Sequence, residues 1–356
     1  MIVLGIESTA HTFGVGIATD EGDILANVND IYTPPPGTGM HPRDVAEHHV
    51  KVAHQVLKKA LEKANITIDK VDAIAFSQGP GLGPVLRVGA TIARALAVKY
   101  RKPLVPVHHG IAHIEIAKLV TGFRDPLVVL ISGGHTMILA YSEGRYRVFG
   151  ETLDISIGNC LDIFARRLGF SLPGVPKVEE LAKRGRRFVE LPYTVIGQDL
   201  SFSGLLSRAL QLVDEIEKGN IRDISIEDVA LSIVETAYYM LAEVTERAIA
   251  ATGKKQLLVT GGVARSLRLQ EIYREIAKEY KIEVGFVTNE YAGDNGAMIA
   301  YTGALAYICG IEIPVEESVV KQRWRIDTVD VPWVEKIIRG EIKFKTLKEK
   351  YYMSGS

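Results

Sequence analysis

Two histidines stand one helical turn apart in the stretch VPVHHGIAHIEIA, a spacing at which two imidazoles can bind one metal ion. His109 and His113 follow a strand-like run and open a helical pattern, so both side chains should lie on one helix face. In zinc peptidases of the His-x-x-x-His type a glutamate directly follows the first histidine, whereas this chain has Gly110 there. The pair therefore predicts a metal site that lacks the general base of a peptidase.

A carboxylate further along the chain can complete this site. Asp294 lies in YAGDNGAMIA, directly after the last strand-like run, at a place equivalent to that of the histidines in the first half of the chain. If the two halves face each other, Asp294 meets His109 and His113 across a cleft. Two imidazoles and one carboxylate with open positions suit iron(II), zinc or manganese and leave room for the oxygens of a substrate.

Three glycine-rich turns are candidates for binding phosphate or adenosine: SQGPGLG at 77–83, SGGHT at 132–136 and TGGVA at 260–264. Glycine lets backbone N–H groups approach an anion closely, and a helix that follows adds the positive end of its dipole. Each turn alone is as readily a plain connection between elements. Their equivalent places in a repeated pattern favour a shared role in ligand binding.

The elements that position these residues occur twice along the chain. Three short apolar runs separated by glycine turns open the chain, and the pattern returns at Pro126 with PLVVLISGG, HTMILAYSEG and RYRVFGETL. In each half a helix, a strand, a helix, a last strand and a further helix follow. This order is that of a ribonuclease-H-like domain. The sequence therefore predicts an α/β protein with the actin-like (ASKHA) fold, in which two such domains enclose a nucleotide cleft.

The repeat also sets the expected domain boundaries. We predict a first ribonuclease-H-like domain over 1–125, a second over 126–305, and a C-terminal segment over 306–356 whose tail is peripheral. The segment beyond about residue 335 is basic with interleaved aromatic residues. Together with the basic runs at 99–102 and 183–187 it is either a solvated surface or a contact for a nucleic acid or a partner protein.

Composition limits the class of protein. A chain of 356 residues with 47% hydrophobic and 24% charged residues can bury a large core. A net charge of −1 gives no overall attraction to nucleic acid or anionic membrane, so such a partner would need a local patch. No signal peptide and no membrane-spanning run is found, and Cys160 and Cys309 lie far apart without metal-ligand spacing. We expect a cytoplasmic protein.

A series of ordered motifs, spread over residues 1 to about 335, resembles the family of tRNA threonylcarbamoyladenosine transferases. The resemblance is closest to its archaeal and eukaryotic members, the catalytic subunits of the KEOPS complex, formerly described as O-sialoglycoprotein endopeptidases. The motifs are GIESTAHTFGVGI, HPRDVAEHH, GPGLGPVLRVG, HHGIAH, SGGHT, TLDISIGNCLDIFAR, FSGL, TGGVA and GDNGAM.

The resemblance implies transfer of a threonylcarbamoyl group from threonylcarbamoyl-AMP to N6 of the adenosine 3′ of the anticodon, in tRNAs that read ANN codons. It implies His109, His113 and Asp294 as ligands of one divalent metal, iron first and zinc or manganese as alternatives, with magnesium possible alongside a nucleotide. Glu7 and Ser8 would approach the reacting group. The substrate-binding positions that it implies are Leu130, Ile131, Ser132, Gly133, Gly134, Asp162, Val175, Glu179 and Ser266.

The resemblance further implies partners and a mechanism. The partners are tRNA, threonylcarbamoyl-AMP or ATP, a small kinase-like subunit and other KEOPS subunits, with no membrane. An activated mixed anhydride needs positioning and a Lewis acid rather than a nucleophilic serine or cysteine. We therefore expect the adenosine amine to attack the carbamoyl carbon directly.

Three positions depart from the family pattern. Leu130 stands where archaeal members often have a tyrosine that binds the metal, Val175 replaces a glycine of the PGGP turn, and Ser266 replaces an asparagine after GGVA. Alternative functions are an ATP-binding regulatory module without its own transferase chemistry, a metallopeptidase, and a sugar or acetate kinase of the same fold.

Overall fold

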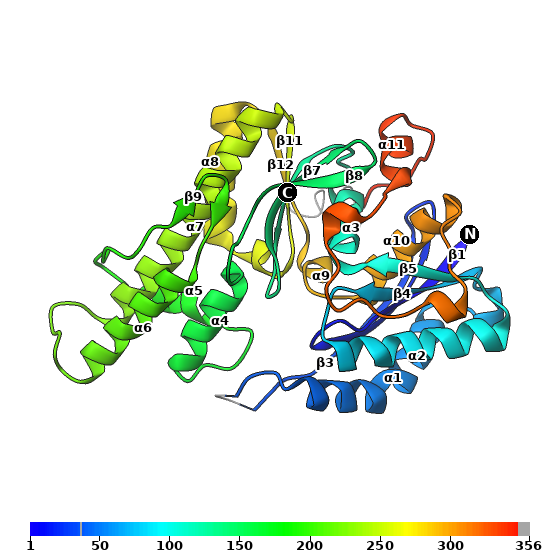
Figure 1. The fold of residues 1–356 in the computed structure, drawn as a ribbon, viewed down its shortest axis with the longest axis horizontal. Coiled ribbons are helices and arrows are strands. Elements are labelled where there is room, and N and C mark those ends of the chain that lie inside the picture. Colours follow the sequence, from blue (N-terminus) through cyan, green and yellow to red (C-terminus); the bar gives the residue numbers. More distant parts are fainter. Residues whose placement is uncertain (36–37, 348–356) are drawn as a thin grey trace.

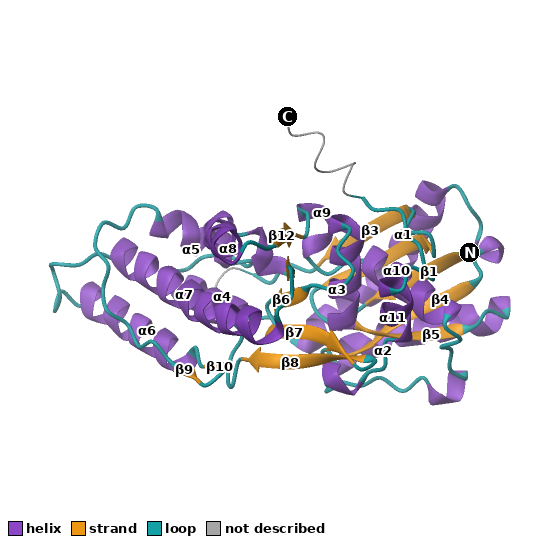
Figure 2. Ribbon diagram, turned by 90° about the horizontal axis from the view of Figure 1, so that it is seen from above, coloured by secondary structure: helices purple, strands orange, loops and turns teal. Residues whose placement is uncertain are grey.

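The computed structural model describes residues 1–35 and 38–347, which form two mixed sheets with the same topology (Figures 1 and 2). The strand order of the first sheet is β3-β2-β1-β4-β5, with β1, β2 and β3 antiparallel and β4 and β5 parallel to β1. Its strands are β1 (Ile2–Glu7), β2 (Thr12–Thr19), β3 (Ile24–Ile31), β4 (Ala73–Gly79) and β5 (Leu104–His108).

The second sheet repeats this arrangement. Its order β8-β7-β6-β11-β12 again combines an antiparallel meander with two parallel strands. Because both sheets have the strand order of a ribonuclease-H-like domain, the repeat predicted from the sequence is confirmed. The strands are β6 (Leu127–Ile131), β7 (Thr136–Ser142), β8 (Arg145–Glu151), β11 (Gln256–Thr260) and β12 (Glu283–Phe286).

Two helices cover the outer face of the first sheet. The helices α1 (Pro42–Ala64) and α2 (Gly83–Tyr100) pack against each other and against β2, β3 and β4, below the sheet in the view of Figure 1. Their apolar residues recur at helical spacing, so each helix buries one face and leaves the other polar. Every residue of β4 is buried, as expected for a strand covered by helices on both faces.

Two buried helices lie at the centre of the molecule. Helix α3 (His109–Thr121) packs against the second sheet at β11 and β6, and α10 (Gly296–Ile308) packs on β1 and β2 of the first sheet. A Cβ on Gly296 would lie 2.2 Å from the Gly16 nitrogen, so glycine permits this close approach. Each half thus contributes a central helix to the other. The domain boundaries drawn from the sequence stay a prediction.

An insertion between β8 and α7 was not predicted in detail. It extends away from the first sheet in Figure 1 and leads into α7 (Ile226–Thr252) and then α8 (Leu267–Tyr280). Helix α7 starts with a capping box between Ser225 and Asp228. The inserted elements are α4 (Ile157–Arg167), α5 (Val175–Ala182), β9 (Val195–Ile196), β10 (Asp199–Leu200) and α6 (Ser203–Glu217).

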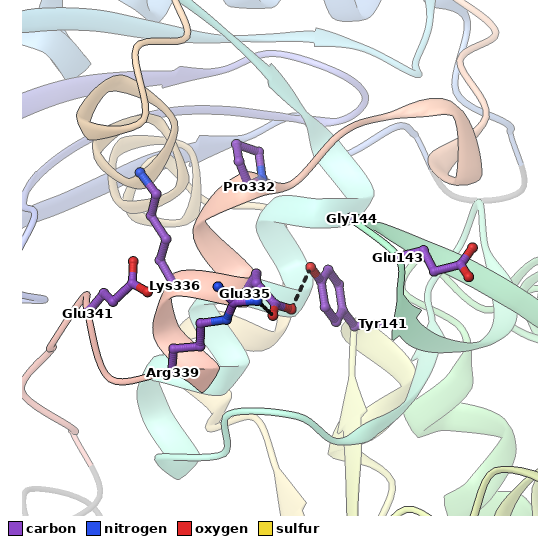
Figure 3. A pocket seen from close by; sticks show the side chains of 8 residues that line it. All are labelled: Tyr141, Glu143, Gly144, Pro332, Glu335, Lys336, Arg339 and Glu341. Carbon is purple, nitrogen blue, oxygen red and sulfur yellow. Dashed lines mark hydrogen bonds and ion pairs between the residues drawn. The ribbon is translucent and has the colours of Figure 1, made fainter.

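The C-terminal segment packs back onto both halves. Ile326, Val331 and Trp333 are buried, and α11 (Pro332–Ile338) lies against β7 (Figure 3). There Tyr141 donates a hydrogen bond of 3.3 Å to Glu335. Residues 348–356 of the predicted tail lie outside the described residues. The remaining short elements are α9 (Asn289–Ala292) and the 3₁₀ turns Ile68–Lys70, Gly262–Arg265, Val315–Glu317 and Ile326–Thr328.

Within the described part of the chain, no helix combines the length and the apolar character needed to cross a membrane.

Candidate metal centre and substrate-binding residues

The first turn of α3 is fixed by a histidine that caps it. His108 precedes the helix, and its Nδ1 accepts hydrogen bonds from the N–H groups of Gly110 and Ile111, at 3.1 and 3.3 Å. Its Nε2 donates to the carbonyl oxygen of Trp324 at 3.0 Å. Burial lowers the pKa of His108 to about 4, consistent with a neutral ring that uses one nitrogen as donor and the other as acceptor. The start of α3 is therefore tied to the C-terminal segment.

The three predicted ligands converge at the junction of the two halves. Asp294 Oδ1 lies 3.4 Å from His109 Nε2 and 3.2 Å from His113 Nε2. The three candidate ligand atoms all lie within 4.8 Å of one another. The histidines come from α3 and Asp294 from the loop between α9 and α10, so two distant segments build one cluster.

A buried carboxylate lies behind the first histidine. Glu7, at the end of β1, accepts a hydrogen bond of 3.1 Å from His109 Nδ1. The same carboxylate accepts the Thr9 N–H at 2.8 Å and the Thr9 hydroxyl. Metal-bound histidines commonly donate their second ring N–H to a carboxylate in this way, which fixes the ring and its tautomer. Glu7 therefore contacts a candidate ligand, and its side chain is committed to that contact.

The charges of the cluster favour a cation. Burial by itself would lower the pKa of His109, but Glu7 and Asp294 raise it to about 10. Burial opposes the charge on Asp294 as well, yet His109 holds the pKa of that carboxyl well below its usual range. The carboxylates of Glu7 and Asp294 thus favour positive charge at His109.

The donor set fits a divalent metal. Its nitrogen and oxygen atoms belong to the ligand types of iron, zinc and manganese. Among the described residues, the Nδ1 atom of His113 has no hydrogen-bond partner, and Leu130 is fully buried in β6 with an aliphatic side chain. Leu130 consequently offers no ligand atom at the position that is often tyrosine in the resembling family.

A histidine of the second half lies beside the candidate metal ligands. The ring of His135 stacks on that of His109 with 6.2 Å between ring centroids. Burial lowers the pKa of His135 to about 3, with His109 contributing. His135 belongs to the SGGHT motif, which signalled a ligand turn but not this contact with the metal cluster. The stack places the turn 132–136 directly beside the candidate metal centre.

The backbone of this turn is exposed at two glycines. Ser132 Oγ accepts the N–H groups of Gly134 and His135, at 3.3 and 3.1 Å, and the Gly133 carbonyl accepts the Ser156 hydroxyl at 2.5 Å. A Cβ added to Gly133 or Gly134 would meet no described atom within 4 Å. The turn is therefore held by side chains while leaving open space over its glycines, as a ligand would require.

The turn at 77–83 is different. A Cβ on Gly79 would lie 1.9 Å from the Lys321 carbonyl oxygen, and one on Gly83 would lie 2.5 Å from the Gln322 side chain. The C-terminal segment fills this space, since Lys321 N–H donates to the Gln78 carbonyl oxygen at 2.8 Å. Close packing explains the glycines of this turn.

Two further predicted residues meet in the second half. Glu179 on α5 accepts hydrogen bonds from Tyr238, at 2.6 Å, and from the Ser266 hydroxyl. Ser266 also caps α8 by accepting the Leu269 N–H at 3.0 Å. The hydroxyl of Ser266 therefore both donates and accepts a hydrogen bond. Tyr238 is a partner that the sequence analysis missed.

The other predicted positions make different contacts. Asp162 accepts the Gly174 N–H at 2.7 Å, and burial raises the pKa of its carboxyl. Val175 is half-buried at the start of α5, and the side chain of Ile131 is fully buried. Ser8 is buried, and its hydroxyl donates to the Val85 carbonyl at 2.8 Å, away from the cluster.

Solved structures support the fold. The crystal structure of HypF from T. kodakarensis aligns with 87% of this chain and 48% of its own length, with a TM-score of 0.58 and 15% identity. The activator of 2-hydroxyisocaproyl-CoA dehydratase from Clostridium difficile aligns with 88% of this chain and 99% of its own, with a TM-score of 0.50 and 14% identity. These likenesses agree with the predicted actin-like (ASKHA) fold.

Sequence relatives are much closer. The tRNA N6-adenosine threonylcarbamoyltransferase of Caldivirga maquilingensis is 62% identical over 94% of this chain and 98% of its own length. The protein of the same name from Thermofilum pendens is 60% identical over 93% of this chain and 96% of its own. A family model described as "TsaD: tRNA N6-adenosine threonylcarbamoyltransferase" matches residues 23–301. The chain therefore belongs to the tRNA N6-adenosine threonylcarbamoyltransferase family.

Proposed function

We propose that this protein transfers the threonylcarbamoyl group of threonylcarbamoyl-AMP to N6 of the adenosine 3′ of the anticodon in tRNAs that read ANN codons. The observation that carries the proposal is the contact between His109 of the ligand cluster and His135 of the open turn. A cation site at the cluster and an anion site at the turn would therefore lie side by side. The named relatives support threonylcarbamoylation of tRNA, and they give no support to a peptidase or a regulatory module without transferase chemistry.

His109, His113 and Asp294 would hold one divalent metal. By resemblance we propose iron, with zinc or manganese as alternatives, and magnesium as a possible companion of a bound nucleotide. A bound ion would act as a Lewis acid toward the carbamoyl carbonyl group. Glu7 would keep the Nδ1 proton of His109 in place, so that the Nε2 atom faces Asp294 and the ion.

The open turn would receive the adenylate. We assign the phosphate to the exposed backbone of Gly133 and Gly134, whose surroundings leave room for it. Ser132 would hold the turn in shape through the hydrogen bonds that it accepts. We place the nucleoside toward Asp162 and Glu179, with Ser266 fixing the Glu179 carboxylate.

The reaction needs no covalent intermediate on the enzyme. A bond forms between N6 and the carbamoyl carbon, the bond from that carbon to the phosphate oxygen breaks, AMP leaves, and N6 releases one proton. The side chains that might otherwise attack are unsuited, because the Ser8 hydroxyl is bonded to Val85 and burial raises the pKa of Cys160 to about 12. We therefore propose direct attack by the adenosine amine.

The archaeal-type motifs also support a proposal about partners. Besides tRNA we propose a small kinase-like subunit, other KEOPS subunits and a separate enzyme that makes the adenylate. A cytoplasmic location is part of the same proposal. It agrees with a tRNA substrate.

The proposal is tested by transfer of labelled threonylcarbamoyl from its adenylate to unmodified tRNA, with the chain and its partner subunits. We expect labelling that chelation abolishes and that His109→Ala/His113→Ala reduces to background, while the exposed His54→Ala control retains activity. Binding of adenylate or ATP without transfer by the wild type would contradict the proposal in favour of a regulatory module. A threonylcarbamoyl group trapped on the chain would contradict direct attack.

A further inference from the structure

The segment from the end of α4 to just beyond α5 carries an excess of positive charge. Residues 166–187 contain seven Lys or Arg residues against two Glu residues, in a chain whose net charge is −1. A polyanion attracted to this protein therefore has to be bound by a local surface. The basic segment 166–187 offers such a surface, and it begins four residues after Asp162 and ends eight residues after Glu179, the two predicted substrate positions.

In both helices a cation follows a predicted substrate-binding carboxylate by four residues. In α4, Arg166 follows Asp162 by four residues, and at the end of α5, Lys183 follows Glu179 by four residues. Residues four apart share a helix face. In each helix, therefore, a carboxylate assigned to the substrate is succeeded by a cation one turn further out. The basic residues therefore start within one helical turn of the predicted substrate-binding carboxylates.

Arg166 stands where the first half approaches the second. A Cβ on Gly39, in the segment between β3 and α1, would lie 2.9 Å from Arg166 Nη1. Figure 1 shows that segment extending toward α4. Within the described residues, the Nε atom of Arg166 is buried without a hydrogen-bond partner. The guanidinium thus has unused donor capacity beside the junction.

The charge continues outward on the exposed surface. Lys177, Arg184 and Arg186 are exposed, and none of the three forms an ion pair within the described ranges 1–35 and 38–347. Phe188 follows directly and is 57% exposed. Free guanidinium groups bind phosphate oxygens, and an exposed aromatic ring can stack on an unpaired base.

Of the remaining cations, Arg167 is held by Asp214 and Glu217 on α6, at 2.6 Å each, and two others have weak partners. Lys183 pairs with Glu180 at 3.0 Å and Arg187 with Asp223 at 2.9 Å, all with well-exposed side chains. Such surface pairs contribute little stability, so phosphate groups can replace the carboxylates. The segment therefore combines free and exchangeable cations within one short stretch of the chain.

We propose that the basic segment 166–187, with Phe188, binds the phosphate backbone of the tRNA and guides its anticodon loop to the substrate site. This inference rests on the proposed function and goes beyond it by naming the surface that holds the nucleic acid. The ligand class is RNA phosphate, because Arg166 and Lys183 each follow by one helical turn a carboxylate that the proposed function assigns to the nucleoside. An acidic protein partner is the competing occupant.

The test is binding of unmodified tRNA to the full-length chain over a series of salt concentrations. The variant Arg184→Glu/Arg186→Glu reverses two exposed cations, and Lys51→Glu/Lys59→Glu on α1 makes the same charge change in the first half. We expect the first variant to weaken tRNA binding about tenfold or more and to reduce the slope of log affinity against log salt by about 1 for each lost contact. The control should stay within about twofold of wild type.

A second variant guards against a folding defect. Lys177→Glu/Arg184→Glu alters a different exposed pair and should lower affinity and salt slope in the same direction. Unchanged affinity and slope in both variants would overturn the proposal. So would lost binding of partner subunits with unchanged tRNA affinity, since that assigns the surface to a protein.

Transfer measured on the same variants separates this inference from the proposed function. At saturating tRNA the variants should transfer at the wild-type rate, with a raised KM for tRNA. If the wild type transfers the group and the variants show an unaltered KM for tRNA, only the proposed tRNA-binding surface is overturned. Absence of transfer by the wild type would overturn the proposed function.

Discussion

The two halves of the molecule share one topology but use their glycine-rich turns differently. In the first half the turn at 77–83 is filled by the C-terminal segment, and a Cβ on Gly79 would collide with the Lys321 backbone. In the second half the turn at 132–136, which follows a different strand of the repeat, leaves open space over Gly133 and Gly134. The first half instead supplies the candidate metal ligands of α3. The histidines of the candidate cation site thus come from the first half, whereas Asp294 and the open turn come from the second.

This division shows why a glycine motif alone does not identify a ligand site. The same residue type serves close packing at 77–83 and access at 132–134, and only the neighbouring segments distinguish the two uses. The C-terminal segment that fills the first turn also accepts the hydrogen bond of His108, at the start of the helix with the candidate metal ligands. Packing in one half therefore supports the chemistry at the junction.

Substitution of one glycine in each half tests this comparison with the largest expected effect. Gly79→Ala should lower the free energy of unfolding by about 3 kcal/mol, because its Cβ meets backbone and its φ is +155°. Gly134→Ala should change that free energy by less than about 0.5 kcal/mol but weaken adenylate binding about tenfold. Denaturant unfolding and calorimetric titration measure both. Equal losses of unfolding free energy in the two variants would refute the different roles of the two turns.

Metal affinity should depend on pH through the ionisation of His109. Its pKa is raised to about 10 from 6.5, so its protonated form stabilises the metal-free fold fully below about pH 6.5, and this contribution is lost as pH rises through 10. A metal ion displaces that proton. Apparent metal affinity should therefore rise about tenfold per pH unit from about pH 7 to 9, with release of about one proton. Titration in buffers of different ionisation enthalpy measures this release, and pH-independent affinity would argue against it.

Glu7 should strengthen the metal site without being a ligand. Glu7→Gln removes the charge that accepts the His109 Nδ1 proton, so metal affinity measured above pH 10, where protons no longer compete for His109, should fall about 10- to 100-fold while the fold is kept. Competition with a coloured chelator gives the affinity. The exposed Glu47→Gln on α1 is the matched control. Unaltered affinity in the Glu7 variant would remove Glu7 from the site.

The smallest effect concerns the second half. Ser266→Ala removes the cap of α8 and one donor to Glu179, and should lower the free energy of unfolding by about 1 kcal/mol. Ser266→Asn restores a capping side chain and should stay within about 0.5 kcal/mol of wild type. Chemical denaturation compares the two. Equal losses in both variants would show that the cap contributes little.

The sequence predicted the repeated fold well because its signals are local. Alternating apolar runs, glycine turns and amphipathic helices gave two meanders and their helices, and the same order is found in both sheets. The convergence of Asp294 with the histidines followed from the equivalence of the two halves. What local patterns could not give is the exchange of α3 and α10, which depends on glycine contacts between segments almost 300 residues apart, such as Gly16 with Gly296.

Long-range packing also explains the other omissions. The capping role of His108 requires a carbonyl from Trp324, and the stack of His135 on His109 requires the two halves to meet. The sequence showed that Ser266 departs from the family pattern. Its hydrogen bond to Glu179 depends on how the inserted α5 lies against α8. The assignment of the substrate positions stays a prediction.

Anomalous diffraction from crystals of the metal-loaded protein with a non-hydrolysable adenylate analogue would test the arrangement at the junction. We predict one ion bound by His109 Nε2, His113 Nε2 and an oxygen of Asp294, with the analogue's phosphate against the backbone of Gly133 and Gly134. An ion bound elsewhere, or an analogue seated on the turn at 77–83, would contradict the division of roles between the two halves.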